Sequence, residues 1–221
     1  LEQGCPVDSV LTEDAFWYLT EKSSIAPPMV PPPLKNKGKY IISLSKMCEW
    51  LGEKCEEAGI NIFPEFPAAE VLYDDYDRVI GIRTGDKGRG RDGQELGNFE
   101  PGSDIVARLT VLAEGTQGHL TGAALDRFAL HGENPQVWAL GVKEVWRVAK
   151  PLDRVVHTMG WPLRSSRRYR EFGGSFVYPM GDDMVSLGFV AGLESRDVEF
   201  SVHDVLQELK THRLLRKILR G

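Results

Sequence analysis

Two glycine-containing segments, a turn and a pair within a strand, are the parts of the sequence best suited to binding a large, flat ligand. The first is Ala-Glu-Gly-Thr-Gln-Gly at 113–118, which follows an apolar run and precedes a helical pattern. The second is the pair Gly173 and Gly174, which interrupts an otherwise aromatic strand pattern. Glycine lets the backbone approach a planar or phosphorylated ligand without an intervening side chain. The first turn therefore predicts a ligand-binding sheet edge, and the second predicts either an apolar slot with backbone donors or an ordinary β-bulge.

The other motifs in the sequence predict little chemistry. Residues 88–93 match G-x-G-x-x-G, but residues 94–102 cannot form the helix that would hold a dinucleotide phosphate, so we interpret the match as a hairpin loop. The five histidines and three cysteines have no metal-binding spacing. The sequence contains neither a G-x-S-x-G motif nor a Walker A motif. We therefore predict no catalytic side chain and no metal ligand in this chain.

The elements that lead to the first turn form an α/β pattern. Apolar residues at helical spacing predict a helix at about 45–58 that ends at Gly59, with Cys48 and Cys55 on one buried face. A short strand at 60–63 would complete half of a parallel βαβ unit. The next expected elements are a hairpin of strands 69–73 and 79–84, a loop at 85–103 and a buried central strand at 104–113.

The elements around the glycine pair form an antiparallel pattern, with strands expected at 137–148, 155–161, 172–178 and 184–191. A last helix is expected over 201–219, with Ser201 as its N-cap and Asp204 at position N3. We interpret the basic residues in its second half as a solvated helix end that the helix dipole favours. The pattern predicts an α+β fold: a partial α/β unit with a β-meander, joined to a mainly antiparallel sheet with a C-terminal helix.

The composition is that of an ordinary globular protein. The chain has 221 residues, of which 42% are hydrophobic and 27% charged, and a net charge of −5, which argues against a general nucleic-acid-binding protein. No apolar run is long enough to span a membrane, and no signal peptide is recognisable. Because the chain starts with Leu1 rather than Met, we expect it to be an excerpt of a longer chain. The proline-rich residues 25–34 predict an extended loop, either a rigid linker or a contact for a membrane or hydrophobic ligand.

Eight short stretches, taken in order, resemble the electron-transfer flavoprotein–ubiquinone oxidoreductase family. They are Leu-Thr-Glu-Asp at 11–14, Gly-Lys-Tyr-Ile-Ile at 38–42, Ala-Ala-Glu-Val-Leu at 68–72, Ala-Glu-Gly at 113–115, Gly-His-Leu at 118–120, Gly-Val-Lys-Glu-Val-Trp at 141–146, His-Thr-Met-Gly-Trp-Pro-Leu at 157–163 and Gly-Gly-Ser-Phe at 173–176. Each glycine-rich piece is a weak signal by itself, whereas the ordered set with similar spacing is specific.

The resemblance implies an enzyme that takes electrons from reduced electron-transfer flavoprotein and passes them through FAD and a [4Fe-4S] cluster to ubiquinone. This chain would be its middle part and inactive alone, because the family's N-terminal phosphate-binding glycine unit and its C-terminal cluster cysteines are absent. By resemblance, Glu114, Gly115 and Gly118 contact FAD. By the same resemblance, Gly173 and Gly174 contact the quinone ring.

The implied domains are an apolar segment at 1–38 near the quinone and the membrane surface, the later part of the FAD-binding domain at 39–130, and an incomplete quinone-binding domain at 131–221. The enzyme is expected to be a peripheral membrane protein, on the cytoplasmic face of the inner membrane if bacterial and on the matrix side of the mitochondrial inner membrane if eukaryotic. Two alternatives stay open: a FAD-dependent reductase of the geranylgeranyl-reductase type, and a non-enzymatic β-rich domain that binds a lipid or a protein through residues 25–34.

Overall fold

A computed structural model of the chain describes residues 4–116, 118–181 and 183–220. The chain forms two compact units: residues up to Gly59 together with those from Gln136 form the first, and Ile60–Pro135 form the second. The α+β class predicted from the sequence is confirmed, because several sheets combine with a few short helices. Within the described ranges, no helix is long and apolar enough to cross a membrane.

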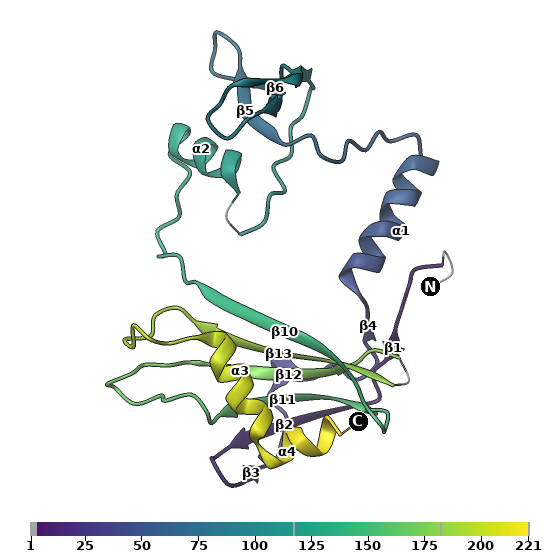
Figure 1. Cartoon of the computed structure of the whole chain (residues 1–221), viewed down its shortest axis with the longest axis vertical. Helices are drawn as coiled ribbons and strands as arrows, with labels where there is room; N and C mark the ends of the chain where they lie inside the picture. The colour runs from purple at the N-terminus through teal and green to yellow at the C-terminus, as the bar shows by residue number, and fades with distance from the viewer. Residues whose placement is uncertain (1–3, 117, 182, 221) are drawn as a thin grey trace. The chain divides into compact units, whose positions relative to one another are not determined.

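The first unit is built on a six-stranded sheet in the order β10-β13-β12-β11-β2-β3 (Figure 1). Its four predicted strands are confirmed as β10 (Ala139–Arg147), β11 (Arg154–Gly160), β12 (Gly173–Pro179) and β13 (Met184–Gly192). The two remaining strands, β2 (Glu13–Leu19) and β3 (Ser24–Ile25), come from the N-terminal part of the chain. The pairing of β2 with β11 is parallel, and every other pairing in this sheet is antiparallel.

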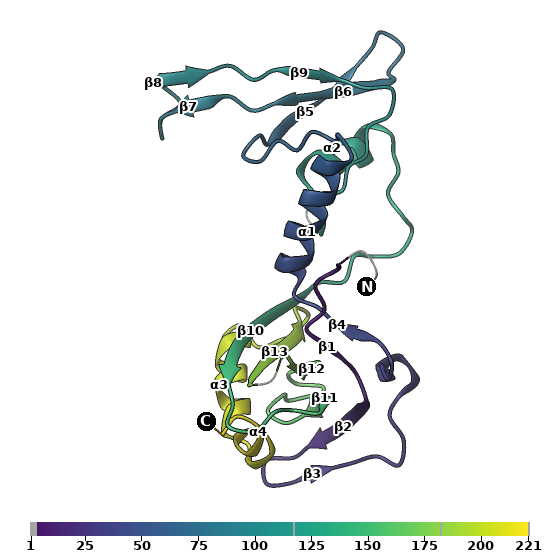
Figure 2. The same ribbon diagram turned by 90° about the vertical axis from the view of Figure 1, so that its right-hand side faces the viewer.

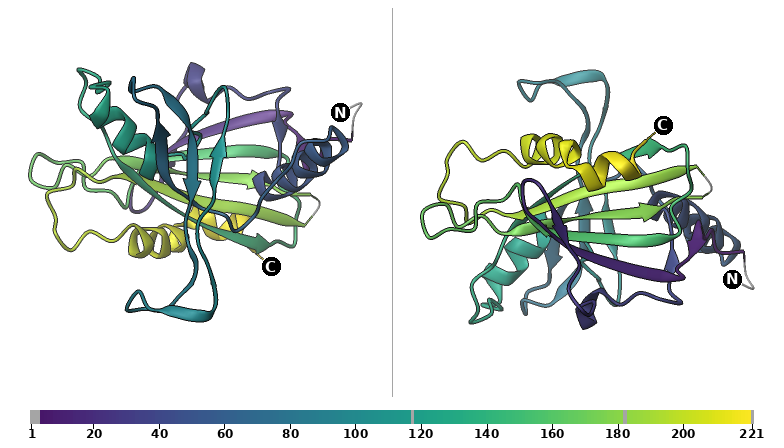
Figure 3. Two further views of the ribbon diagram at one scale, coloured as in Figure 1. Left: turned by 90° about the horizontal axis from the view of Figure 1, so that it is seen from above. Right: turned by 90° about the horizontal axis from the view of Figure 1, so that it is seen from below.

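One face of this sheet packs against two helices, α3 (Val202–Thr211) and α4 (Arg213–Ile218), as Figures 2 and 3 show. Alternate strand residues point to this face because the side-chain period of a strand is two. The shared core is formed by buried aliphatic side chains and one phenylalanine, including Val156, Val177, Leu187, Phe189, Leu206, Leu209 and Leu215. The intervening residues of the same strands therefore point to the opposite face.

The expected helix over 201–219 is wrong in one respect, because it breaks at His212, which has an extended backbone and ends α3 before α4 begins. Imidazole hydrogen bonds stabilise the break. Nδ1 of the buried His212 accepts the N–H of Leu214, and Nε2 lies 3.1 Å from the carbonyl oxygen of Thr20. Since a carbonyl only accepts, Nε2 is the protonated nitrogen. The predicted N-cap is confirmed, since the Ser201 hydroxyl accepts the N–H of Asp204.

The opposite sheet face is partly covered by the N-terminal segment that follows β3. Here a short 3₁₀ turn, η1 (Pro32–Leu34), leads to a two-stranded ladder of β1 (Ser9–Val10) and β4 (Tyr40–Ile41). Leu11 and Ile41 pack on Val155 and Tyr178 of the sheet in a small second core. The helix that follows, α1 (Leu44–Glu57), is confirmed, but none of its residues is buried. The prediction of two buried thiols on it is therefore wrong, because Cys48 is exposed and Cys55 only partly buried.

The second unit contains the sheet β5 (Ala68–Tyr73), β6 (Val79–Thr84) and β9 (Asp104–Val106), the hairpin β7 (Lys87–Arg89) and β8 (Glu95–Glu100), and the helix α2 (His119–Arg127). The β5–β6 hairpin is confirmed. The G-x-G-x-x-G match does lie in a hairpin, although the predicted loop at 85–103 contains the two strands of that hairpin. Two strand predictions are wrong. Residues 60–63 form no strand, and the strand at 104–113 ends at Val106. Leu109 and Val111 are exposed, and no strand of the described chain pairs with the segment that contains them.

Candidate functional site

An apolar cavity of about 390 Å³ lies on the sheet face opposite α3 and α4. It is lined from five strands, by residues that include Phe16 of β2, Ala139 of β10, His157 and Met159 of β11, Phe176 of β12 and Val190 of β13. Leu34 of η1 adds a wall from the N-terminal segment, and Trp138 adds an aromatic wall before β10. All of these residues belong to the first unit. A mainly apolar cavity of this volume suits a small or medium-sized organic ligand.

Gly173 and Gly174 form part of the wall of this cavity, as the sequence predicted for a slot. The ladder between β11 and β12 stops at Thr158 and Ser175, one residue before the glycine pair. On the other side, both glycines remain paired with β13. Successive residues of a strand direct their backbone groups to opposite neighbours, so one of the two glycines directs its N–H and carbonyl to the β11 side, where the ladder has stopped next to an apolar space. A ligand carbonyl would be a suitable partner for such an N–H.

The same glycines also have a structural role that does not depend on a ligand. A Cβ on Gly173 would meet the backbone oxygen of Val190, and a Cβ on Gly174 would meet the backbone oxygen of Thr158. Both collisions are with neighbouring strands, which cannot move aside as the end of a flexible side chain can. Close strand packing thus requires glycine at both positions. The register of β12 with β13 runs through both glycines without a bulge, so the β-bulge alternative is wrong, and the close approach of the neighbouring strands takes its place.

Three aromatic rings lie together at one side of the cavity, and two of them, those of His157 and Phe176, line it. Phe176 stacks on Tyr178 with ring centroids 4.6 Å apart, and Tyr178 meets the His157 imidazole edge-on at 5.8 Å. The Phe176 ring occupies the space that a side chain would take at Gly188 on the next strand, since a Cβ there would collide with the ring. Gly188 therefore allows the ring to lie flat on the sheet and gives the cavity a planar wall.

His157 is the only titratable side chain among the residues that line the cavity, and it was not predicted from the sequence as a site residue. Its Nε2 lies 3.4 Å from the Tyr178 hydroxyl, and its buried Nδ1 has no hydrogen-bond partner among the described residues. Burial lowers the pKa of His157, while the carboxylate of Asp14 acts more weakly in the opposite direction. The imidazole is therefore neutral at pH 7 and carries one N–H for donation. Its place on β11, opposite Phe176 of β12, follows from the strand register and gives no signal in the sequence.

Two polar contacts hold the strands and the loop next to the cavity. Behind the wall, the hydroxyl groups of Thr158 and Ser175 are hydrogen-bonded at 2.6 Å, and both residues are buried. In the loop before β12, the carboxylate of Glu171 is almost fully buried and accepts hydrogen bonds from the backbone and the guanidinium of Arg164. Arg164 also pairs with Asp197 of the loop after β13. These contacts join the two loops at this end of the sheet.

The predicted cofactor turn lies in the second unit and has a clear local role. The carboxylate of Glu114 accepts the backbone N–H groups of Leu120 and Thr121 and the Thr121 hydroxyl, so it caps the start of α2. These bonds, first the one from the Thr121 side chain, lower the pKa of Glu114. A Cβ on Gly118 would crowd Glu114 and Thr121, so Gly118 is needed for this cap.

Gly115 differs from Gly118, since its backbone has a φ of +77° and nothing lies within 4 Å of the position of a Cβ. The structure thus brings Glu114 and Gly118 together around the start of α2 and leaves Gly115 open on one side. The buried strand expected to lead into this turn is absent beyond Val106. In the described part of the chain, no group of three or more His, Cys, Asp or Glu side chains is placed to hold a metal ion.

Comparison with known proteins gives consistent results. Residues 138–221 match the family model described as ETF-QO, ubiquinone-binding. The whole chain aligns with electron transfer flavoprotein-ubiquinone oxidoreductases: it is 39% identical to the mitochondrial proteins of Arabidopsis thaliana and Homo sapiens and 38% identical to a probable one of Acinetobacter baylyi. The chain spans 35%, 36% and 39% of the length of these three relatives. The resemblance inferred from the sequence is therefore confirmed.

Solved structures support the fold. A geranylgeranyl bacteriochlorophyll reductase-like protein from Thermoplasma acidophilum has a TM-score of 0.66 at 17% identity, and the match covers 96% of this chain and 48% of that one. A flavin-dependent brominase has a TM-score of 0.57 at 15% identity, covering 94% of this chain and 47% of the other. At such identities the likeness extends to the fold alone. The reductase alternative is thus not favoured over the family with which the chain shares 38–39% identity.

Proposed function

We propose that this chain, which is similar throughout to electron transfer flavoprotein-ubiquinone oxidoreductases, supplies the quinone-binding part of such an enzyme. In the complete enzyme, electrons would pass from reduced electron-transfer flavoprotein through FAD and an iron–sulfur cluster to ubiquinone. The observation that best supports this proposal is the apolar cavity bounded by Gly173 and Gly174. Except for Phe16, every strand residue that lines it lies in the range 138–221 that matches the ubiquinone-binding family model.

A quinone ring is flat and apolar with a carbonyl oxygen at each end, and the cavity matches both properties. The Phe176 ring offers a planar wall, and Val190 and Leu34 offer aliphatic surface. Backbone groups of the glycine pair and the N–H of His157 are the available hydrogen-bond donors near that surface. The residues of this chain would bind and orient the ring and exclude water from it, and no acid or base other than His157 lines the cavity.

The fit of the chain to FAD is limited to one residue. Two of the N–H groups at the start of α2, those of Leu120 and Thr121, are already bound by Glu114, so these two cannot also bind a phosphate of the cofactor. We propose that Gly115, whose open side leaves room for a ring system, lies against the flavin, and that Glu114 and Gly118 only shape the turn. When bound, FAD would supply the redox chemistry.

The cysteines of the chain do not fit a [4Fe-4S] cluster. Such a cluster is held by four thiolates, whereas this chain has three cysteines, all of them free. The ligands of the proposed cluster would therefore come from another part of the enzyme.

We also propose that residues 25–34 contact the membrane from which the quinone comes, on the cytoplasmic or the matrix side. Ile25 and Met29 are more than half exposed, and prolines stiffen the segment, which lowers the entropic cost of ordering it. Replacing Met29 and Val30 by Asp is expected to reduce sedimentation with phospholipid vesicles. Unchanged sedimentation would contradict this contact.

The quinone proposal is tested by filling the cavity. Val190 lines it and points to the cavity face, so Val190→Phe would take up part of its volume. Titration of the purified chain with decylubiquinone, followed by fluorescence of Trp138 at the cavity wall, is expected to show an affinity at least about tenfold lower for this variant, as for the loss of one well-placed apolar contact.

The matched control is Val145→Phe on β10, where the side chain is also exposed but does not line the cavity. It is expected to bind decylubiquinone as the unchanged chain does. Equal affinity of the Val190→Phe variant and the control would remove the cavity from the proposal.

A further inference from the structure

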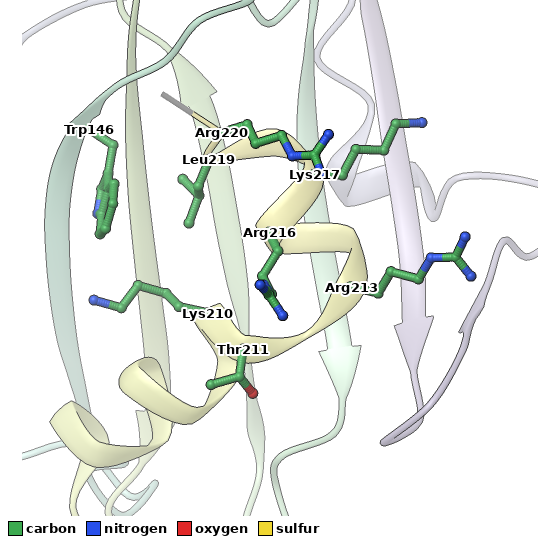
Figure 4. A pocket seen from close by; sticks show the side chains of 8 residues that line it. All are labelled: Trp146, Lys210, Thr211, Arg213, Arg216, Lys217, Leu219 and Arg220. Atoms are coloured by element: carbon green, nitrogen blue, oxygen red, sulfur yellow. The ribbon is translucent and has the colours of Figure 1, made fainter.

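The surface formed by α4 and the end of α3 is strongly basic. A depression of about 780 Å³ is lined there by five cationic side chains, Lys210, Arg213, Arg216, Lys217 and Arg220, and by no carboxylate (Figure 4). We call this group the α4 basic surface. It lies against the sheet face opposite to that of the apolar cavity, so the two sites do not share a lining residue.

Four of the five charges have no partner in the described chain. Lys210 is paired with Glu144 at 2.8 Å and lies over the Trp146 ring. Arg213, Arg216, Lys217 and Arg220 are exposed and make no ion pair among the residues that the structure describes. For a chain with a net charge of −5, this is a marked local excess of positive charge.

The helix dipole accounts for only two of the four unpaired charges. Arg216 and Lys217 lie in the last turn of α4, where the helix dipole favours cations. Arg213, in contrast, is the first residue of α4, where the dipole disfavours a cation, and Arg220 lies beyond the C-cap Leu219. Residues 213, 216 and 217 are spaced by three and four, so they share one side of the helix. The charges are thus gathered on a surface beyond what the helix itself requires.

The surroundings of the patch indicate which kind of partner it fits. No large apolar side chain among residues 201–220 is exposed, so this surface has no group that could insert into a lipid bilayer. Exposed arginines combined with a partly buried tryptophan are instead typical of contacts between proteins. Proteins that exchange electrons form small, transient contacts, and complementary charge speeds their encounter.

We infer that the α4 basic surface is a docking site for an acidic protein surface, and that the partner is the electron-donating flavoprotein. The inference rests on the proposed function for the identity of the partner. The guanidinium groups would pair with carboxylates of the partner, because their fork geometry suits carboxylate oxygens. Their main effect would be on the rate of association, which falls as salt screens the charges.

The test uses charge reversal and a control of equal charge. In the test variant, Arg213, Arg216 and Lys217 are replaced by Glu. In the control, Lys35, Lys37 and Lys39 are replaced by Glu, which changes the net charge equally on exposed residues outside the patch. The association rate constant of each chain with purified electron-transfer flavoprotein is measured by surface plasmon resonance at about 20 mM and about 200 mM salt.

The test variant is expected to associate at least about tenfold more slowly than the unchanged chain at low salt and to lose most of the salt dependence. The control is expected to change less than about threefold. A variant with Gln at the same three positions of α4 is expected to give an intermediate association rate. Its neutral side chains perturb the fold less than Glu does, and thermal denaturation of each variant shows whether it is folded. Equal loss in test and control, or no loss in the test variant, would overturn the inference.

Two further measurements separate this inference from the proposed function. Decylubiquinone binding is expected to be unchanged in the test variant, because the cavity lies on the other sheet face. If the chain binds the flavoprotein through α4 but binds no quinone, the proposed function fails and the docking inference stands. If the test variant instead loses binding to phosphatidylglycerol vesicles and keeps its rate with the flavoprotein, the surface binds lipid headgroups and the docking inference is wrong.

Discussion

Gly174→Ala is expected to destabilise the first unit even though it adds only one methyl group. The added Cβ would collide with the backbone oxygen of Thr158 on the neighbouring strand, and Met159 Cγ would lie 3.3 Å away. Relief requires a shift of strand backbone, and overpacking of this kind costs about 1–3 kcal/mol. For a chain of this size, about 2 kcal/mol corresponds to a fall in Tm of about 4–8 °C.

The matched control is Gly141→Ala in the same sheet. There the added Cβ would lie 3.5 Å from the Val190 side chain, an ordinary contact, and alanine costs less entropy than glycine in a strand. Its Tm is expected to stay unchanged or to rise slightly. Urea denaturation followed by circular dichroism gives the free energy of unfolding of both variants. If Gly174→Ala were as stable as the Gly141→Ala control, the close strand packing would be refuted, and the glycine pair would be explained by its ligand alone.

Three other perturbations test the framework around the cavity. Thr158→Val should lower the free energy of unfolding by about 1–3 kcal/mol, because it leaves the buried Ser175 hydroxyl without its partner, and the double variant with Ser175→Ala should recover part of this loss in urea denaturation. His212→Ala removes a helix cap and should cost about 1–2 kcal/mol, whereas an unchanged midpoint would show that the break between α3 and α4 does not depend on the imidazole. The guanidinium of Arg164 lowers the pKa of Asp197 in the folded chain. This ion pair therefore stabilises the fold above the pKa that Asp197 has in the unfolded chain, and its contribution is lost as the pH falls through the lower folded pKa. An Asp197→Asn variant should lose less stability than the unchanged chain on acidification below about pH 4.

The sequence allowed the antiparallel sheet to be predicted well because its strands bury their alternate residues within this chain. Strands β10 to β13 each have a neighbour in the same unit and contribute side chains to the core that they share with α3 and α4. The predicted strand at 104–113 fails for the opposite reason. Leu109 and Val111 have strand-like apolar spacing but remain exposed, because no described segment pairs with them. Residues 60–63 fail in the same way, since a parallel strand needs a partner to form.

The candidate site was predicted in part. Glycine reveals where backbones approach closely, so Gly173 and Gly174 could be selected from the sequence as wall residues. Their collision partners, Val190 and Thr158, could not, because contacts across strands depend on register. His157 was missed because a single histidine in an apolar strand carries no spacing signal. Leu34 closes the cavity from a segment far away in the chain, which only the fold brings close.

The most direct test of the central claim, that the cavity holds a quinone ring, is a two-dimensional NMR titration of the isotope-labelled chain with decylubiquinone. If the ring binds there, the amide signals of Gly173 and Gly174 and the imidazole signals of His157 shift in a saturable way. The amide of Gly81, in the β5–β6–β9 sheet of the second unit, should stay in place. Saturable shifts that leave Gly173, Gly174 and His157 unaffected and appear elsewhere in the chain would contradict quinone binding in this cavity.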